Sequence, residues 1–391
     1  MGSLVEDIRV IDTDSHVVEP ADLWTSRVAA KWGDLVPHVL WDDKAGEDAW
    51  FIGDERVAPA SSAAQAGWRE YPPDHPPRLS EAEPETWEVN QRLAYMDRMG
   101  IHAQALYPNV AMFNANRLAS LVDQDLQLAV VRAYNDWQTE WSAPAPDRLL
   151  PMASLPFWDI DATVVEMARC AEAGHRGVVF TQDPAFFGQP MLADRHWDPM
   201  WSAAEQLGLP INFHIGSSDT ALLATTGHPD SGKHANYASI GVSFFMGNAR
   251  TLAQLICSGI CHRFPDLKFV SVESGIGWIP FAMDALDWQW DNCGVAVEHP
   301  EYDLRPSEYF RRQIFGCFWF ERAALPYAIE RLGPDNILYE TDFPHPTSMS
   351  PGPATSAIEP KAFIEEVFAG IDRVDARKIL HDNAARLYRL D

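Results

Sequence analysis

Five side chains of the types that bind divalent metals follow short apolar runs in the sequence. The first run leads into Asp-Thr-Asp-Ser-His at residues 12–16, and in an extended strand Asp14 and His16 point to the same side. The other three are His214, Glu273 and Asp342, each at the end of a run of its own. Imidazole and carboxylate ligands without thiolate suit divalent Zn, Mn or Fe. The pattern therefore predicts a divalent metal site, with one ion favoured over two.

A metal held in this way lowers the pKa of bound water toward neutrality and polarises a substrate carbonyl or carboxylate. Asp342 and Glu273 are the candidate general bases. His345, three residues after Asp342, is a further candidate catalytic residue that orients substrate, moves protons or binds metal. Hydrolysis and non-oxidative loss of CO2 are both accessible to such a site, and the sequence does not separate them.

Two alternatives to this chemistry stay open. A second ion between Glu273 and Asp342 would give a dinuclear centre that activates O2, which describes an iron- or manganese-dependent oxygenase. Residues of ligand type do not prove that a metal is bound, so a catalytically silent barrel serving as a structural subunit beside an active paralogue is the other alternative. The metal content of the purified protein distinguishes the three hypotheses.

The elements that must position these residues alternate between short apolar runs and helix-period stretches, which is typical of a parallel sheet built from βα units. The runs are 9–12, 103–107, 150–155, 177–180, 210–214, 268–272, 313–316 and 336–339. Their number and length predict a (β/α)8 TIM barrel, in which reactive groups lie at the carboxyl ends of the strands. No Gly-x-Gly-x-x-Gly follows the first run, which argues against the alternative of a doubly wound dinucleotide fold.

Residues 41–87 interrupt this alternation, because they are rich in Pro and Trp and contain no long periodic segment. We expect one domain over residues 1–391, with 41–87 as a cap-like insertion after the first strand that packs over the barrel or at a subunit contact. Residues 216–247 are predicted to form a second long loop. Tyr107, Phe157 and Trp158 close the second and third strands, and we predict that they line the substrate pocket.

Three further residues are candidates for supporting roles. Arg117 and Arg176 are possible anchors for a substrate carboxylate, although the sequence does not position either one against the metal. Glu19 follows the first metal pair closely, and we expect it to hydrogen-bond a ligand histidine.

Composition narrows the classes of partner and the compartment. The 391 residues include 56 Asp and Glu against 30 Lys and Arg, a net charge of -26 that repels nucleic acids and anionic membranes. Five cysteines without a Cys-x-x-Cys pair suggest buried thiols in a reducing compartment. The sequence shows neither a signal peptide nor an apolar run long enough to span a membrane, so we expect a cytoplasmic enzyme with a small-molecule substrate.

Several motifs, taken in order, resemble a known family. They are Asp-Thr-Asp-Ser-His-Val-Val-Glu-Pro (12–20), Ile-Asn-Phe-His-Ile-Gly (211–216), Arg-Phe-Pro-Asp-Leu-Lys-Phe-Val-Ser-Val-Glu-Ser-Gly (263–275), Glu-Thr-Asp-Phe-Pro-His-Pro (340–346) and Asp-Asn-Ala-Ala-Arg-Leu-Tyr (382–388). Together they resemble the second family of the amidohydrolase superfamily, which includes aminocarboxymuconate semialdehyde and γ-resorcylate decarboxylases. The resemblance implies a metal-dependent hydrolase or decarboxylase (lyase) acting on a small carboxylate- or carbonyl-bearing substrate, a class that includes aromatic molecules. It also implies a homo-oligomer, and a hetero-oligomer with a paralogue is the other assembly considered.

The resemblance also assigns roles to individual residues. His214 matches the metal histidine of the fifth strand, and Asp342 matches the aspartate of the eighth strand that contacts metal and accepts a proton from bound water. Members often carry His-x-His or Glu-x-His on the first strand, where this chain has Asp14 and His16. Glu273 stands where the similar decarboxylases usually carry a catalytic histidine, and this departure leaves the reaction type open.

Overall fold

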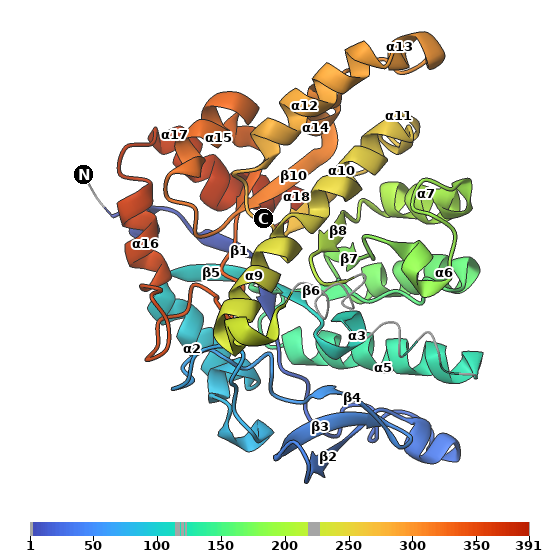
Figure 1. Ribbon diagram of the computed structural model, residues 1–391, viewed down its shortest axis with the longest axis vertical. Coiled ribbons are helices and arrows are strands. Elements are labelled where there is room, and N and C mark those ends of the chain that lie inside the picture. The colour runs from blue at the N-terminus through green and yellow to red at the C-terminus, as the bar shows by residue number, and fades with distance from the viewer. Residues whose placement is uncertain (1–2, 114–117, 119–120, 122, 218–226, 391) are drawn as a thin grey trace.

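Eight parallel strands close into a barrel surrounded by helices (Figure 1) in the computed structural model, which describes residues 3–113, 118, 121, 123–217 and 227–390. Around the barrel the order is β1 (Val10–His16), β11 (Ile337–Tyr339), β10 (Ile314–Phe318), β9 (Phe269–Val272), β8 (Ile211–His214), β7 (Gly177–Val179), β6 (Leu149–Ala153) and β5 (Ile101–Tyr107). The (β/α)8 prediction is confirmed, and each predicted run contains or overlaps a barrel strand.

β1 joins the two ends of the sheet. It pairs in parallel with β5, where Val10 is opposite Ile101, and with β11, where Asp12 is opposite Tyr339. All seven residues of β1 are buried, including the polar stretch that continues beyond Asp12. Strands buried on both faces read as continuous apolar runs, which is why the sequence locates them.

Helices cover the outside of the barrel. The longer ones are α2 (Val89–Met99), α5 (Gln124–Ser142), α6 (Ile160–Glu172), α7 (Asp198–Leu207), α9 (Lys233–Phe245), α10 (Gly247–Cys257), α12 (Ile279–Asn292), α14 (Pro306–Gln313), α15 (Ala324–Leu332) and α16 (Pro360–Val367). Shorter ones are α1 (Leu4–Asp7), α3 (Val110–Phe113), α11 (Ile260–Arg263), α13 (Val295–Glu298), α17 (Arg373–Arg377) and α18 (Asn383–Tyr388). Local sequence fixes several ends: the Asp123 and Asp159 carboxylates cap α5 and α6, and Gly208 ends α7 with a φ of 65°.

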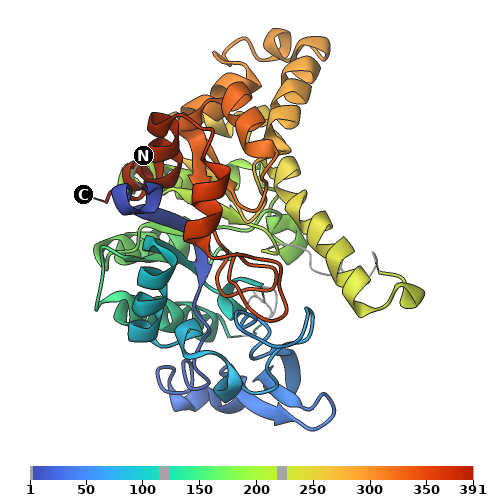
Figure 2. The ribbon, with the colours of Figure 1, turned by 90° about the vertical axis from the view of Figure 1, so that its left-hand side faces the viewer.

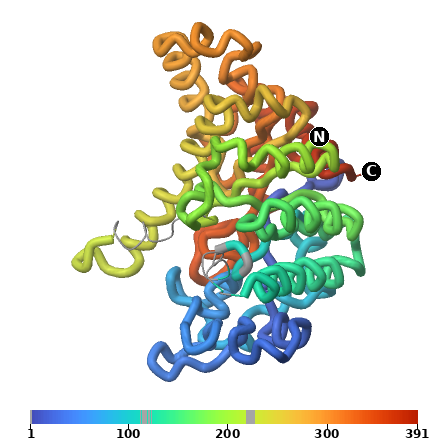
Figure 3. Tube along the Cα trace, turned by 90° about the vertical axis from the view of Figure 1, so that its right-hand side faces the viewer, coloured from blue at the N-terminus to red at the C-terminus, as the bar shows by residue number. Residues whose placement is uncertain are grey.

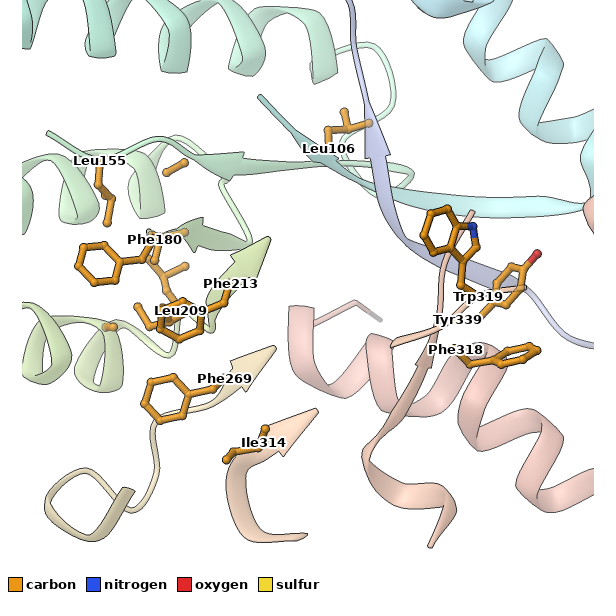
Figure 4. Close-up of a cluster of buried hydrophobic side chains, with 14 of the residues drawn as sticks. Leu106, Leu155, Phe180, Leu209, Phe213, Phe269, Ile314, Phe318, Trp319 and Tyr339 are labelled. Carbon is orange, nitrogen blue, oxygen red and sulfur yellow. The ribbon is translucent and has the colours of Figure 1, made fainter. Parts of the chain in front are cut away.

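Buried side chains form an outer and an inner layer of core. The outer layer lies between strands and helices and includes Phe180, Phe213, Phe269 and Ile314 (Figure 4). Along the strands, residues of the inner layer alternate with residues of the outer layer. The helix α18 contributes Ala384, Leu387 and Tyr388 to the inner layer. The Tyr107 and Tyr388 hydroxyls both donate to Oδ1 of Asn212, each at 3.1 Å. The last helix thus closes the barrel interior beneath the strand ends.

The segment predicted as an insertion contains regular structure that the sequence pattern did not indicate. β2 (His38–Asp42), β3 (Glu47–Ile52) and β4 (Glu55–Pro59) form an antiparallel sheet with β3 in the middle. Figure 3 shows this sheet, in blue, at one end of the molecule. Trp50 on β3 is buried edge-on against Trp24, with ring centroids 5.0 Å apart, and this contact attaches the sheet to the main core.

The prediction of a long loop over 216–247 is wrong for its second half, because α9 occupies Lys233–Phe245. Glycine, serine and histidine, which favour helices weakly, obscured it. Residues 218–226 lie outside the described part of the chain. No residue of α9 is buried, and Figure 2 shows this yellow helix leaning out from the body.

Two expectations from composition can be compared with the structure. Cys170, Cys261 and Cys317 are buried, whereas Cys257 and Cys293 are exposed, so the expectation of buried thiols holds for only part of the set. Among the described residues, no helix combines the length and apolar character that a bilayer crossing requires.

Candidate metal centre and catalytic cavity

Asp14, His16, His214, Glu273, Asp342 and His345 converge at the carboxyl ends of the barrel strands. Nε2 of His16 lies 3.0 Å from Nε2 of His214, and Oδ1 of Asp14 lies 3.5 Å and 3.4 Å from these two nitrogens. Oε2 of Glu273 is 3.4 Å from Nε2 of His214. On the opposite side of the cluster, Oδ1 of Asp342 is 3.7 Å from Nε2 of His16 and 2.9 Å from Nδ1 of His345.

The donor atoms of this cluster fit a divalent cation. The 3.0 Å between the two imidazole nitrogens fits two ligands about 90° apart on one ion with bonds of about 2.1 Å, as in octahedral coordination. The carboxylate oxygens of Asp14 and Asp342 are buried and accept no hydrogen bond of normal geometry from the described residues. Buried anions without such partners are costly, and a cation between them would remove that cost.

Burial and mutual repulsion shift the pKa values of these acids. Burial raises the pKa of Glu273 to about 8, and it raises the pKa of Asp342 well above its usual range with a further contribution from the nearby Glu273 charge. Burial lowers the pKa of His16 to about 4. For His214 burial acts in the same direction, but the Asp14 carboxylate outweighs it and the pKa rises to about 9. Such crowding of titratable groups is typical of functional sites.

Backbone strain falls on two residues of the cluster. Glu273 and Asp342 have φ values of 54° and 57°, in the left-handed region that residues other than glycine rarely adopt. Each follows its barrel strand and turns its carboxylate toward the histidines. Strain of this kind persists where the surrounding structure holds it, and it is common at active sites.

A buried amide positions His345. Nδ2 of Asn109 donates to the Val17 carbonyl at 2.9 Å and to the Glu19 carboxylate at 3.2 Å, so Oδ1 of Asn109 faces Nε2 of His345 at 2.7 Å. Because Oδ1 only accepts, Nε2 of His345 must carry the proton, and the neutral ring presents its Nδ1 lone pair to Asp342. Glu19 also accepts from the backbone amides of Asn109 and Val110, so it acts on a histidine of the cluster through Asn109 rather than directly.

Sequence reasoning missed two residues of this site. Glu340 is buried, accepts from the backbone amide of Glu273 at 3.0 Å, and has a pKa raised well above its usual range by burial. Its position directly after β11, two residues before Asp342, was the available signal. Asn109 lies just beyond β5, in a Tyr-Pro-Asn sequence that carries no metal-ligand signal.

A cavity of about 1090 Å³ opens over the cluster. Glu273 and His345 line its inner end. Its walls come from residues 58–63, 71–72, 237–245 and 346–358, together with Phe320, Arg322 and Phe363. Part of the inserted segment and one side of α9 therefore enclose the space above the candidate metal site.

The structure does not place the predicted pocket aromatics on this cavity. Tyr107 is fully buried below the histidines, with its ring 5.2 Å from that of His214. Phe157 packs against Trp158 and Phe187 at ring distances of 5.4 Å and 5.2 Å, in the outer core. The segments folded over the strand ends supply the walls instead, and the positions of these segments are not encoded in the strand pattern.

Neither arginine considered as a substrate anchor is placed at the cluster. The Arg176 guanidinium donates to the Arg389 carbonyl, and Arg176 precedes β7, at the strand end away from the metal ligands. Arg117 lies outside the described residues. Two further histidines lie apart from the cluster: His262 pairs with Asp303, and Nδ1 of His234 contacts the Pro72 carbonyl.

Comparisons with known proteins agree with this architecture. The amidohydrolase family model (Amidohydro_2) matches residues 11–390. γ-Resorcylate decarboxylase of Rhizobium sp. (strain MTP-10005) is 28% identical over 319 residues, which cover 77% of this chain and 86% of the relative. An amidohydrolase from Mycobacterium avium subsp. paratuberculosis K-10, known from a crystal structure, is 26% identical in sequence. The two structures align with a TM-score of 0.76 over 98% of this chain and 99% of that one.

A second solved structure is that of 2,6-dihydroxybenzoate decarboxylase in complex with 2,6-dihydroxybenzoate. It is 26% identical, with a TM-score of 0.60 over 78% of this chain and 89% of that one. The family model spans nearly the whole sequence, from β1, which carries Asp14, to α18, which closes the barrel. This chain therefore belongs to the amidohydrolase family.

Proposed function

We propose that the protein is a metal-dependent decarboxylase that releases CO2 from a small aromatic carboxylate. The observation that carries the proposal is the buried cluster of carboxylates and imidazoles at the inner end of a cavity large enough for an organic substrate. Two of the relatives support the choice of reaction, since they are named as decarboxylases of γ-resorcylate and 2,6-dihydroxybenzoate. Zn, Mn and Fe remain the candidate metals.

Four residues would hold the ion: Asp14, His16, His214 and Asp342. When bound, a divalent ion would supply positive charge that attracts and orients the substrate carboxylate. Glu273 lines the cavity beside this position, and we assign it the proton transfer to the ring carbon that bears the carboxylate. The bond between that carbon and the carboxylate breaks, CO2 leaves, and the new C–H bond takes the transferred proton.

His345 has a separate role in this scheme. Its Nε2 proton is fixed by Asn109, and its Nδ1 faces Asp342 across 2.9 Å. The ring is stacked on that of His16 with centroids 3.6 Å apart, so it cannot turn without separating from a metal ligand. Nδ1 can only accept, so the contact is a hydrogen bond when Oδ1 of Asp342 carries a proton, and we assign His345 to accepting that proton from Asp342 and returning it.

The test uses protein loaded separately with Mn²⁺, Zn²⁺ or Fe²⁺ and incubated in D2O with carboxyl-¹³C hydroxybenzoates, including 2,6-dihydroxybenzoate. We expect ¹³CO2 and deuterium at the vacated ring carbon. Glu273→Gln should lower the rate at least about 10²-fold, whereas Glu298→Gln, an exposed change on α13, should not alter it. Absence of ¹³CO2 from every substrate and metal would contradict decarboxylation.

Hydrolysis is the second candidate, and Glu273 is the observation that favours it. A carboxylate replaces the histidine usual in similar decarboxylases, and a carboxylate beside a metal site is suited to activating water. The two reactions differ in the fate of solvent oxygen. In H2¹⁸O, hydrolysis of an ester or amide places ¹⁸O in the carboxylate product, while decarboxylation yields no new carboxylate.

We also propose a homo-oligomer, in line with the family resemblance. On α12, Phe281 and Trp288 are 75% and 67% exposed and lie seven residues apart, so they share one face of the helix. Large apolar side chains exposed together favour burial against a second copy. Light scattering should show a mass above 43.8 kDa that the double substitution Phe281→Glu and Trp288→Glu returns to that of one chain.

A further inference from the structure

The cavity above the metal centre is much larger than a single aromatic ring requires. Its volume is about 1090 Å³, whereas an interior cavity of about 150 Å³ holds benzene. A benzoate bound with its carboxylate at the cluster would leave most of this volume to water. The excess space therefore calls for a substrate with a further part beyond the ring.

The walls of the cavity indicate the chemistry of that further part. Around the outer space the described lining is mainly apolar and includes Pro59, Ile240, Phe244, Phe320 and Ile358. Within the described part of the lining, the carboxylates are Glu19 and Glu273, both at the inner end. An uncharged, apolar group matches the outer walls.

The distribution of cations argues against a second acidic group on the ligand. Among the described lining residues, Arg322 carries the only lysine or arginine charge. Its guanidinium is already paired with Glu366 and lies over the Phe363 ring, 5.0 Å from the centroid. A second carboxylate in the cavity would have to break that pair or remain without a cationic partner.

One side of α9 keeps the outer space open. Tyr237, Ile240, Gly241 and Phe244 line the cavity at helical spacing. A Cβ atom at Gly241 would meet no atom within 4 Å, so a side chain there would enter open space without a clash. Val242, the next residue, is 61% exposed and is not part of the lining.

From these observations we propose that the substrate is a monocarboxylate whose aromatic head carries an extended apolar substituent, which the outer cavity binds. The inference builds on the proposed function, because it places the carboxylate at the metal centre. It goes further by assigning residues 58–63 and 71–72, the cavity side of α9 and the 346–358 segment to binding a long apolar group.

The test is a binding series that does not depend on turnover. Benzoate and 4-methyl-, 4-butyl- and 4-hexylbenzoate are titrated into the metal-loaded protein by calorimetry. We expect Kd to fall about fourfold per added methylene until the cavity is filled. An unchanged or rising Kd along the series would overturn the proposal.

Three variants localise the effect. Gly241→Phe should weaken 4-hexylbenzoate binding at least about tenfold and leave benzoate within about twofold, since it fills only the outer space. Val242→Phe adds the same ring on the solvent side and should leave the whole series unchanged. Gly241→Leu is a smaller filling change that serves if the phenylalanine variant does not fold. Equal weakening of benzoate and 4-hexylbenzoate by the filling variants would contradict the assignment to the outer cavity.

The results separate this proposal from the reaction it rests on. Tighter binding along the series, with no CO2 from the hydroxybenzoates of the first test, would support the apolar cavity and count against decarboxylation. Release of CO2 from the hydroxybenzoates with an unchanged Kd along the series would support decarboxylation and count against the apolar cavity.

Discussion

At the scale of single residues, the site depends on acids and imidazoles that burial has separated from water. Asp14 and Asp342 are completely buried, and the two histidines nearest to them approach each other to hydrogen-bond distance. Isolated charges do not persist in such surroundings unless a counterion is present. Together, these buried carboxylates and closely spaced histidines argue for a bound cation more strongly than any single one of these residues does.

His214→Ala should abolish both metal retention and turnover while the barrel stays folded, because the proposed role of the imidazole is to bind the metal and not to support the packing of the barrel. Metal content by mass spectrometry and circular dichroism measure the two effects. His262→Ala, on α11 and paired with Asp303, is the matched control and should keep its metal. A His214→Ala protein with full metal content and full rate would remove His214 from the ligand set.

Asn109→Ala should change the tautomer of His345, because it removes the acceptor that holds the proton on Nε2. In metal-free protein labelled with ¹⁵N-histidine, the His345 signals should show protonated Nε2 in the wild type and a shifted or mixed state in the variant. The signals of His262 serve as an internal reference. Identical His345 spectra in both proteins would show that Asn109 does not set the tautomer.

At the scale of elements, the junction of α6 and β7 contains a histidine whose protonation destabilises the folded protein. His175 is buried, and its Nε2 contacts the Thr139 hydroxyl at 3.0 Å. That hydroxyl donates to the Asn135 carbonyl, so it accepts from the imidazole. Burial lowers the pKa of His175 to about 4, so the folded protein keeps the ring neutral at pH values where the unfolded chain protonates it.

The sign of the pH effect follows from linkage. Between the unfolded pKa of 6.5 and the folded pKa of about 4, the unfolded state binds more protons, so stability falls as the pH drops through this window. The His175 contribution changes by at most about 1.4 kcal/mol per pH unit. His175→Gln should flatten this part of the dependence in urea unfolding at pH 7, 6 and 5. Parallel curves for variant and wild type would assign the acid sensitivity to other groups.

Elements differ in how well the sequence predicts them. The sequence predicts the barrel strands because strands buried on both faces are continuous apolar runs. It also predicts the residues of the cluster, because a parallel barrel brings the carboxyl ends of all its strands to one face. The β2–β4 sheet was missed because its strands are only partly buried and lack clear alternation. The lining of the cavity could not be predicted, since it depends on how α9 and the segments around Pro59 and Ile358 fold over the barrel.

At the scale of the whole molecule, α18 fills the barrel interior from the side opposite the candidate metal site. Tyr388 packs with the inner cluster and donates to Asn212. Tyr388→Phe should cost about 1 kcal/mol through the lost hydrogen bond, and Tyr388→Ala about 3–5 kcal/mol through the cavity it leaves. Urea unfolding measures both changes. Equal losses in the two variants would mean that packing of the ring contributes little.

Barrel closure also has a consequence for the order of events during synthesis. β1 emerges from the ribosome early, yet its partner β11 is made more than three hundred residues later. Of the four residues that would hold the ion, Asp342 is the last to be made, because it follows β11. Until translation has passed that strand, β1 exposes an unpaired edge and the candidate site lacks Asp342, so the full set of ligands would be completed late in synthesis.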